Sequence, residues 1–163
     1  MEQQEYAQRG YLREDFRLFH LKGAMEEQLD WHYHTFHKLI FFLGGQSGYG
    51  VEGRSYPLEP GDVILVPQGC VHRPEAAPGA PYERVILYLS PDYLARAGTA
   101  DCPLDSCFAL ATARFRFVLR PQEGRQALRR TLFALESASA QPGFGQELLA
   151  KALLTQLLIL LRR

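Results

Sequence analysis

Residues 31–74 decide the fold, and they read WHYHTFHKLIFFLGGQSGYGVEGRSYPLEPGDVILVPQGCVHRP. Glycine-rich and proline-glycine segments at 44–48 and 59–62 interrupt the stretch. Short runs of apolar, β-branched and aromatic residues lie between these turn signals, as expected of consecutive short strands. We therefore predict an antiparallel roll or barrel for this region.

Three of the chain's five histidines lie at the two ends of this stretch. His32 and His34 differ by two positions, so a β-strand would place both imidazoles on the same face of its sheet. His72 joins them if the chain folds back. The same parity on this strand predicts that Phe36, Ile40 and Phe42 also line the interior. On a later strand at 82–89 it predicts Arg84 and Tyr88, with the opposite set of that strand as the alternative.

The sequence resembles the cupin fold, and in particular the amino-terminal sensing domain of AraC-type bacterial transcription regulators. The resemblance rests on His32-x-His34-x-Phe36, the segments 51–58 and 60–67, Gly69-x-x-His72-x-Pro74, and the segment 82–91. Residues 147–162 look like the helix that leads toward the DNA-binding region in that family. This resemblance implies a mainly β fold: a cupin barrel, or double-stranded β-helix of jelly-roll type, followed by an antiparallel pair of α-helices.

The resemblance also raises the question of a metal. Metal-dependent cupins usually hold iron, manganese, nickel or zinc with three histidines and one glutamate, and the position matching that glutamate is Lys38 here. At about 4 Å and an effective dielectric constant of about 20, an ammonium repels a unit positive charge by about 4 kcal/mol, and a divalent cation by about twice that. Two alternatives stay open. His32, His34 and His72 hold one divalent transition metal (Zn, Ni, Fe or Mn), or with Lys38 they form the polar floor of a metal-free ligand pocket.

Length and charge fit one compact domain that does not itself bind DNA. The chain has 163 residues, of which 47% are hydrophobic, and 18 basic residues balance 18 acidic ones. A net charge of zero gives no overall positive field for a nucleic acid. The polar first residues are unlike a signal peptide and no apolar run is long enough to span a bilayer, so we expect a cytoplasmic protein without a membrane partner. The three cysteines are expected to be free thiols in core or loop positions.

The chain divides into four expected parts: an arm at 1–15, the sensing barrel at 16–97, a connecting segment at 98–120, and a helical hairpin at 121–163. Pro121 is a suitable first-turn residue for the first helix of the hairpin. The glycine-proline segment at 141–145 ends that helix, and a second helix is predicted from about residue 146 to residue 162.

The second predicted helix is unusually apolar, with two adjacent leucine stripes. Each buried leucine contributes about 1.5–3 kcal/mol, so a stripe left exposed favours a partner. We predict a homodimer whose interface contains Leu149, Leu153, Leu154, Leu157, Leu158 and Leu161. The alternative is that both stripes are buried within one chain.

The function implied by the resemblance is that of an effector-sensing and dimerisation domain of an AraC-type regulator. A small molecule in the barrel would control DNA binding by a carboxy-terminal helix-turn-helix region, which is not part of this sequence. No catalytic residues and no enzymatic activity are expected. Lys38 and Arg84 favour an acidic or phosphorylated effector. The alternative is a stand-alone metal-dependent cupin enzyme, a dioxygenase or isomerase, against which the missing glutamate counts.

Overall fold

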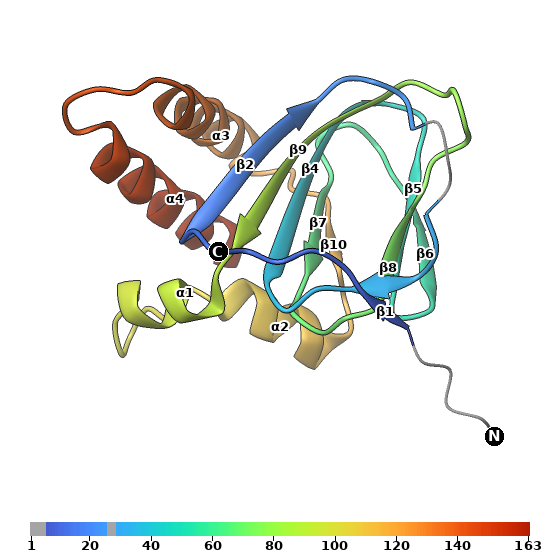
Figure 1. The fold of residues 1–163 in the computed structure, drawn as a ribbon, viewed down its shortest axis with the longest axis horizontal. Coiled ribbons are helices and arrows are strands. Elements are labelled where there is room, and N and C mark those ends of the chain that lie inside the picture. The colour runs from blue at the N-terminus through green and yellow to red at the C-terminus, as the bar shows by residue number, and fades with distance from the viewer. Residues whose placement is uncertain (1–5, 26–28) are drawn as a thin grey trace.

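The computed structural model describes residues 6–25 and 29–163 of the chain. Two five-stranded sheets face each other and form a roll (Figure 1). Sheet A has the strand order β1-β3-β8-β5-β6, and sheet B has the order β10-β7-β4-β9-β2. The mainly β cupin-type roll followed by helices, which the sequence predicts, is confirmed.

The strands are short, as their frequent turn signals predict. Sheet A contains β1 (Ala7–Gln8), β3 (His32–Tyr33), β5 (Gly48–Val51), β6 (Arg54–Pro57) and β8 (His72–Glu75). Sheet B contains β2 (Phe16–Leu21), β4 (His37–Gly45), β7 (Val63–Val66), β9 (Tyr82–Leu89) and β10 (Val118–Leu119). The described helices are α1 (Pro91–Ala97), α2 (Ser106–Arg114), α3 (Arg125–Ala140) and α4 (Gln146–Arg162).

The register between β4 and β9 sorts the side chains of sheet B into two faces. Lys38 lies opposite Tyr88 and Phe42 lies opposite Arg84, so all four side chains share the inner face, toward sheet A. The residues of opposite parity, such as Leu39 and Phe41, face the helices and form the core; Leu39 is fully buried. This alternation separates a partly polar interior from an apolar layer under the helices.

The turn before β7 holds the helical hairpin against the roll. The Asp62 side chain is fully buried and accepts hydrogen bonds from Nε and Nη2 of Arg120 at 2.8 and 2.9 Å. Arg125 donates to the carbonyl of Pro60 at 2.7 Å. Its guanidinium lies so close to Gly61 that a Cβ there would be 2.4 Å from Nη2. Arg120, which follows β10, and Arg125, the first residue of α3, thus both bind the same turn of the roll.

Helices α3 and α4 form the hairpin and cover the outer face of sheet B (Figure 1). The predicted bounds of the second helix are confirmed. The first helix begins at Arg125 rather than at Pro121, because Gly124 adopts a left-handed conformation with φ of 72° immediately before it. The predicted connecting segment contains α2 and also β10, which adds an edge strand to sheet B beside β7.

The leucines of α4 are used mainly within the chain. Leu154, Leu157, Leu158 and Leu161 are buried, with at most 6% of each exposed, so their assignment to a dimer contact is wrong. They pack in the layer that α4 shares with α3 and α2, which is the alternative of intrachain burial. Of the other two predicted residues, Leu153 is partly buried and Leu149 is half exposed.

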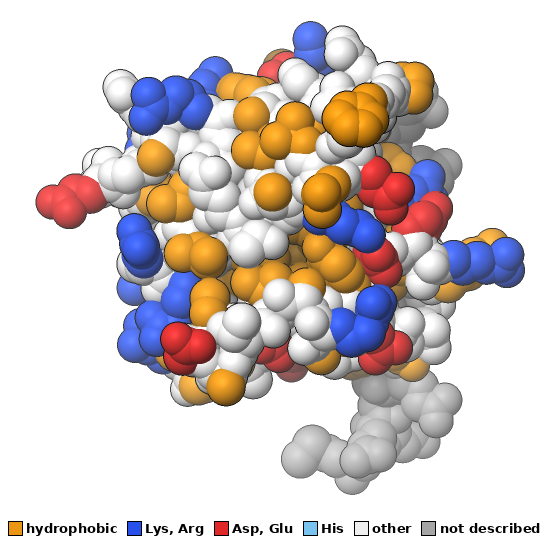
Figure 2. Space-filling view, turned by 90° about the vertical axis from the view of Figure 1, so that its left-hand side faces the viewer, with side chains coloured by type: hydrophobic (Ala, Val, Ile, Leu, Met, Phe, Trp, Pro, Cys, Tyr) orange, Lys and Arg blue, Asp and Glu red, His pale blue; other side chains and the backbone are white. Residues whose placement is uncertain are grey.

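Some apolar surface remains open on the helical side of the molecule. Phe144, Leu148 and Leu149 are exposed around the start of α4. Figure 2 shows hydrophobic side chains on this side interspersed with charged and other polar groups. The described part of the chain has no helix that is both long and apolar enough to cross a membrane. All three cysteines are free, and Cys107 is buried.

Candidate functional site

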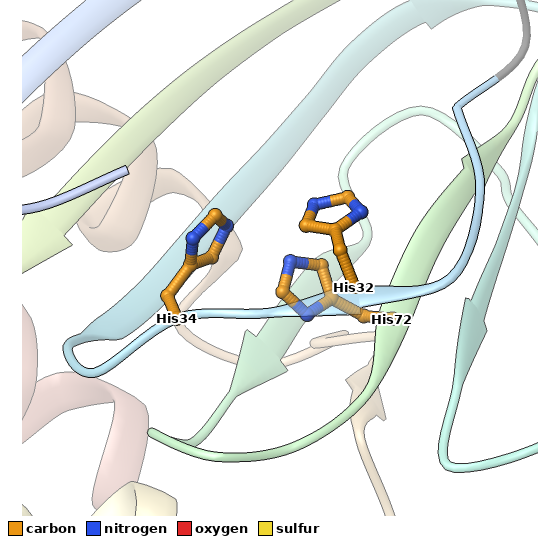
Figure 3. Close-up of side chains that lie close together, drawn as sticks. All are labelled: His32, His34 and His72. Atoms are coloured by element: carbon orange, nitrogen blue, oxygen red, sulfur yellow. The ribbon is translucent and has the colours of Figure 1, made fainter. Parts of the chain in front are cut away.

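Three histidines meet between the two sheets (Figure 3). His32 comes from β3, His34 from the bend that follows it, and His72 from β8. All three side chains are buried, and each offers one ring nitrogen such that the three nitrogens lie within 4.8 Å of one another. The cluster expected from the sequence therefore forms.

His34 reaches the cluster by a route that differs from the prediction. Residues 32–42 are not one continuous strand: the chain leaves sheet A after Tyr33, bends at residues 35–36 and enters sheet B at His37. The backbone N–H of Gly69 donates to the His34 carbonyl at 2.8 Å and so fixes this crossing to the β7–β8 loop. His34 and His32 thus stay together although the strand ends between them.

The backbone fixes which nitrogen of each ring points inward. Every Nδ1 lies at hydrogen-bond distance from a carbonyl oxygen, which can only accept, so each Nδ1 carries the proton. The acceptors are the carbonyls of Asp30 for His32 at 2.8 Å, of Arg9 for His34 at 2.5 Å and of Cys70 for His72 at 2.9 Å. The Nε2 atoms of His34 and His72 are buried and have no hydrogen-bond partner among the described residues. Histidines that bind metals are oriented in this way, through the ring nitrogen that does not bind.

Burial keeps the three imidazoles neutral. It lowers the pKa of His34 to about 4 and that of His72 to about 2, and it also lowers the pKa of His32. Repulsion from the Lys38 ammonium lowers all three pKa values further, while the hydrogen bonds to the carbonyls oppose the shift. At neutral pH the three Nε2 lone pairs are therefore available to a cation or to a hydrogen-bond donor.

Lys38 is the charged neighbour of this cluster. Only 8% of the residue is exposed, and its Nζ lies 5.9 Å from the centroid of the Tyr88 ring. Burial and the repulsion of Arg84 lower the pKa of Lys38 to about 8. Arg84 occupies the same inner face, and its Nη1 donates to the carbonyls of Gly23 and Tyr82. The fixed charges of the interior are thus positive.

Aromatic rings form the wall beside the histidines. Phe36 stacks on His34 with ring centroids 4.6 Å apart, and Tyr88 lies 4.6 Å from Phe36. Two further rings were not among the predicted site residues. Phe19 on β2 packs edge-on against Tyr88, and Tyr49 on β5 lies parallel to the ring of His72. The Tyr49 hydroxyl is buried without a partner in the described chain, and burial raises its pKa well above the usual value.

The two missed rings differ in how visible they are in the sequence. Tyr49 alternates with Val51 on a short strand, so its parity could have placed it on the inner face. The position of Phe19 depends on the pairing of β2 with β9, which no local pattern determines. Sequence reasoning could have found the first of these residues but not the second.

The other predicted lining residues lie on the inner face of sheet B. Arg84 and Tyr88, not the opposite set of β9, share the inner face with Lys38. Ile40 and Phe42 are buried on the same face, farther along β4. The structure thus brings the predicted residues to one interior, with the histidines and Lys38 near one end of β4 and Arg84 toward the other.

The remaining two histidines lie outside this interior. His20 is paired with Glu136 of α3, on the outer face of sheet B. His37 is buried beneath α2, where its ring stacks on Phe108 at a centroid distance of 4.3 Å. Neither side chain contributes to the cluster.

The amino-terminal arm is hydrogen-bonded to strand β3 and to one histidine of the site. Strand β1 pairs in parallel with β3, and the N–H of Arg9 donates to the carbonyl of Tyr33 at 2.9 Å. The carbonyl of Arg9 in turn accepts the Nδ1 proton of His34. The arm is therefore tied directly to one of the three clustered histidines.

A family comparison matches this architecture. The model of the AraC-like ligand binding domain matches residues 18–158, which is most of the chain. The chain belongs to this family. No curated protein matches it.

Solved structures similar to this AraC-like ligand binding domain include several cupins. A cupin-like protein from Thermotoga maritima is 20% identical, with 48% of this chain and 60% of that chain covered and a TM-score of 0.43. A Cupin 2 conserved barrel domain protein from Salinispora arenicola is 16% identical, with 52% and 71% covered and a TM-score of 0.43. The DMSP lyase DddQ from Ruegeria pomeroyi is 20% identical, with 47% and 39% covered and a TM-score of 0.42. The matched region spans less than two thirds of the first and the third of these chains.

The interior of this AraC-like ligand binding domain fits a divalent transition metal. Three neutral imidazoles present ring nitrogens that lie within 4.8 Å of one another, and the Nε2 atoms of two of them have no partner in the described structure. Three histidines and a water molecule are a common ligand set for zinc. Lys38 opposes the metal electrostatically, whereas the carbonyls that orient the rings support it.

Proposed function

We propose that this chain is the effector-sensing domain of an AraC-type transcription regulator, and that a small molecule binds inside the roll. The proposal is supported by membership of the AraC-like ligand binding domain family. The observation that carries it is the set of buried polar atoms without partners in the described interior, the Nε2 atoms of His34 and His72 and the hydroxyl of Tyr49. Buried polar groups are rarely left unsatisfied in a native protein, and a ligand would satisfy them.

A divalent transition metal is proposed as part of this site. His32, His34 and His72 would hold it through Nε2, and the carbonyls of Arg9 and Cys70 would keep two of these rings in position. When bound, the metal would supply a Lewis acid that can take an oxygen atom of the effector. Zinc and nickel suit imidazole ligands.

Effector binding could be transmitted along two connections to the roll. One is the hydrogen bond from His34 to the Arg9 carbonyl, which links the site to the arm. The other is the hydrogen bond from Arg125, the first residue of α3, to the carbonyl of Pro60, which links the roll to the helical hairpin. An effector that favours one arrangement of these elements would shift the population of a cytoplasmic regulator between two states. A helix-turn-helix region outside residues 1–163 would respond to this shift in population.

The metal part of the proposal is tested by calorimetric titration of the metal-free protein with zinc at pH 7. The wild type is expected to bind one zinc ion per chain, and His72→Ala at least about 100-fold more weakly, because even partners of metal ligands affect affinity by factors of about 10–100. His20→Ala is the matched control, since His20 faces α3, and it should bind zinc as the wild type does. Equal zinc affinity in His72→Ala would contradict the assignment.

The sensing part is tested with the complete reading frame. An AraC-type regulator is expected to continue past codon 163 into two helix-turn-helix units, and a reporter gene under its control should respond to a ligand that stabilises this domain. A stand-alone enzyme is the second candidate, favoured by three nitrogen ligands that leave coordination positions open to a substrate. A reading frame without a DNA-binding region, together with turnover by the metal-loaded chain, would support the enzyme instead.

A further inference from the structure

Lys38 is a buried cation without a counter-ion. Only 8% of it is exposed, and within the described residues its ammonium makes no ion pair and no hydrogen bond. The charge of Arg84 repels it. Burying a charge is costly unless the charge is paired, so the native function of this site is expected to supply an anion.

The strands offer no acidic side chain that could take this role. On sheet B the inner face carries Lys38 and Arg84, and its other inward positions on β4 and β9 are occupied by apolar or aromatic residues. On sheet A, His72 lies opposite Val51 and Pro74 lies opposite Tyr49, so the inner face there also lacks a carboxylate. The buried Asp62 is on the turn before β7 and is already engaged by Arg120. The missing negative charge must therefore come from outside the described chain.

The surroundings of Lys38 define the rest of the ligand. The ring of Tyr88 lies beside Nζ, and Phe36 and Phe19 extend this wall in both directions. Flat aromatic surfaces next to one ammonium suit a molecule with one anionic group and an apolar body. A sugar would instead require several polar side chains around its hydroxyl groups, and this wall does not provide them.

The histidines explain why the anion needs more than Lys38. Their Nε2 atoms carry lone pairs, which would repel a carboxylate oxygen if nothing lay between them. A divalent cation on these nitrogens turns that repulsion into attraction, and its charge adds to that of Lys38. The two positive groups then act on the same carboxylate.

We propose that the effector is a small carboxylic acid with an apolar body, and that its carboxylate binds between Lys38 and a metal held by His32, His34 and His72. This inference rests on the proposed sensing function and names the class of ligand for the same site. Lys38 thereby takes the place of the protein carboxylate that metal-dependent cupins have, and the ligand supplies the carboxylate instead.

The test uses benzoate and hexanoate, with benzamide and hexanamide as uncharged analogues, in calorimetric titrations of the zinc-loaded chain at pH 7. The variants are Lys38→Met and, as a matched control, Lys22→Met, because Lys22 is exposed. At least one carboxylate is expected to bind more tightly than its amide. Lys38→Met is expected to weaken that carboxylate at least about 30-fold, which corresponds to losing one partner of a buried charge pair. Lys22→Met should bind as the wild type does.

The zinc affinity of each variant separates a direct role from an indirect one. Lys38→Met should bind zinc at least as tightly as the wild type, because a repulsive charge is removed; weaker zinc binding would overturn the proposal. Equal carboxylate affinity in Lys38→Met and the wild type would also overturn it. If the amides bind and the carboxylates do not, the proposed sensing function stands and the ligand class is wrong. If none of the four compounds binds, the ligand class is rejected, while zinc binding still reports on the site itself.

Discussion

His37 should make the stability of this domain sensitive to acid. Its side chain is buried between β4 and α2, where the ring stacks on Phe108 at 4.3 Å and Nδ1 accepts a hydrogen bond from the backbone N–H of Gln68 at 3.0 Å. Burial lowers the pKa of His37 to about 4, against a weaker upward influence of Asp105. The folded protein therefore holds this ring neutral where an exposed histidine would be charged.

The sign and size of the effect follow from linkage. The unfolded chain binds a proton at His37 near pH 6.5, whereas the folded chain binds it only near pH 4. Stability from the neutral ring is complete above pH 6.5 and is lost as the pH falls toward 4. The full difference corresponds to about 3 kcal/mol, of which about 2.5 kcal/mol should be lost between pH 7 and pH 4.5.

The comparison variant is His37→Asn, whose side-chain oxygen can accept the Gln68 hydrogen bond but does not titrate in this range. Urea unfolding at pH 7 and pH 4.5, followed by the fluorescence of Trp31, gives the free energy of unfolding of both proteins; Trp31 is the only tryptophan of the chain. The clustered histidines lose stability in acid in both proteins, so only the difference between the two losses reports on His37. The wild type should lose about 2.5 kcal/mol more than the variant. Equal losses would refute the assignment of a neutral, buried imidazole.

Three further results are expected. Gly45→Ala should destabilise the domain by several kcal/mol, because φ is +108° and a Cβ would lie 2.0 Å from a backbone oxygen of the 81–82 segment; Gly44→Ala has free space around it and should change the thermal midpoint little. Leu157→Ala should cost about 2–5 kcal/mol in urea unfolding, whereas Leu148→Ala, exposed on the same helix, should stay within about 0.5 kcal/mol; a large, concentration-dependent effect of Leu148→Ala would instead reveal a dimer. Zinc at about 100 times its Kd should stabilise the wild type by about 2.7 kcal/mol in the same assay, chelator should remove this gain, and His72→Ala should show none of it.

Most of the prediction of the site rests on the alternation of side chains between the two faces of a β-strand. The inward parity of Lys38 and Phe42 follows from alternation within one strand, and the structure agrees because β4 is regular over those positions. The same reasoning treated residues 32–42 as one strand and was wrong, since the chain changes sheets at residues 35–36. His34 still reaches the interior because Gly69 and Arg9 hold the bend from both sides, and such long-range hydrogen bonds leave no local trace in a sequence.

The helices show a different limit. The apolar pattern located α4 to the residue, because a long amphipathic run and a glycine before it define both ends. What the run packs against is not encoded in its own period. Leu157 faces the interior because α3 and α2 lie on two sides of α4, so a second apolar stripe needs no second protein. The width of the apolar face of a helix thus predicts that this face is buried. Which element covers the face depends on the tertiary fold.

The charge of the site argues for sensing over catalysis. Three histidines, a divalent metal and a glutamate carry a net charge of about +1, which leaves a metal with open positions able to activate a water or a substrate. With Lys38 in place of the glutamate, the proposed metal-loaded site would carry a charge of up to about +3. The binding of an anion to such a site would be strongly favourable, and its release would be slow. Tight retention of a ligand suits a sensor better than an enzyme that must complete a turnover cycle. In that arrangement metal and anion would favour each other's binding by the same factor, because the coupling free energy between two binding events is reciprocal. In the proposed arrangement, the hydrogen bond from His34 to the Arg9 carbonyl would connect the site, with both metal and anion bound, to the arm.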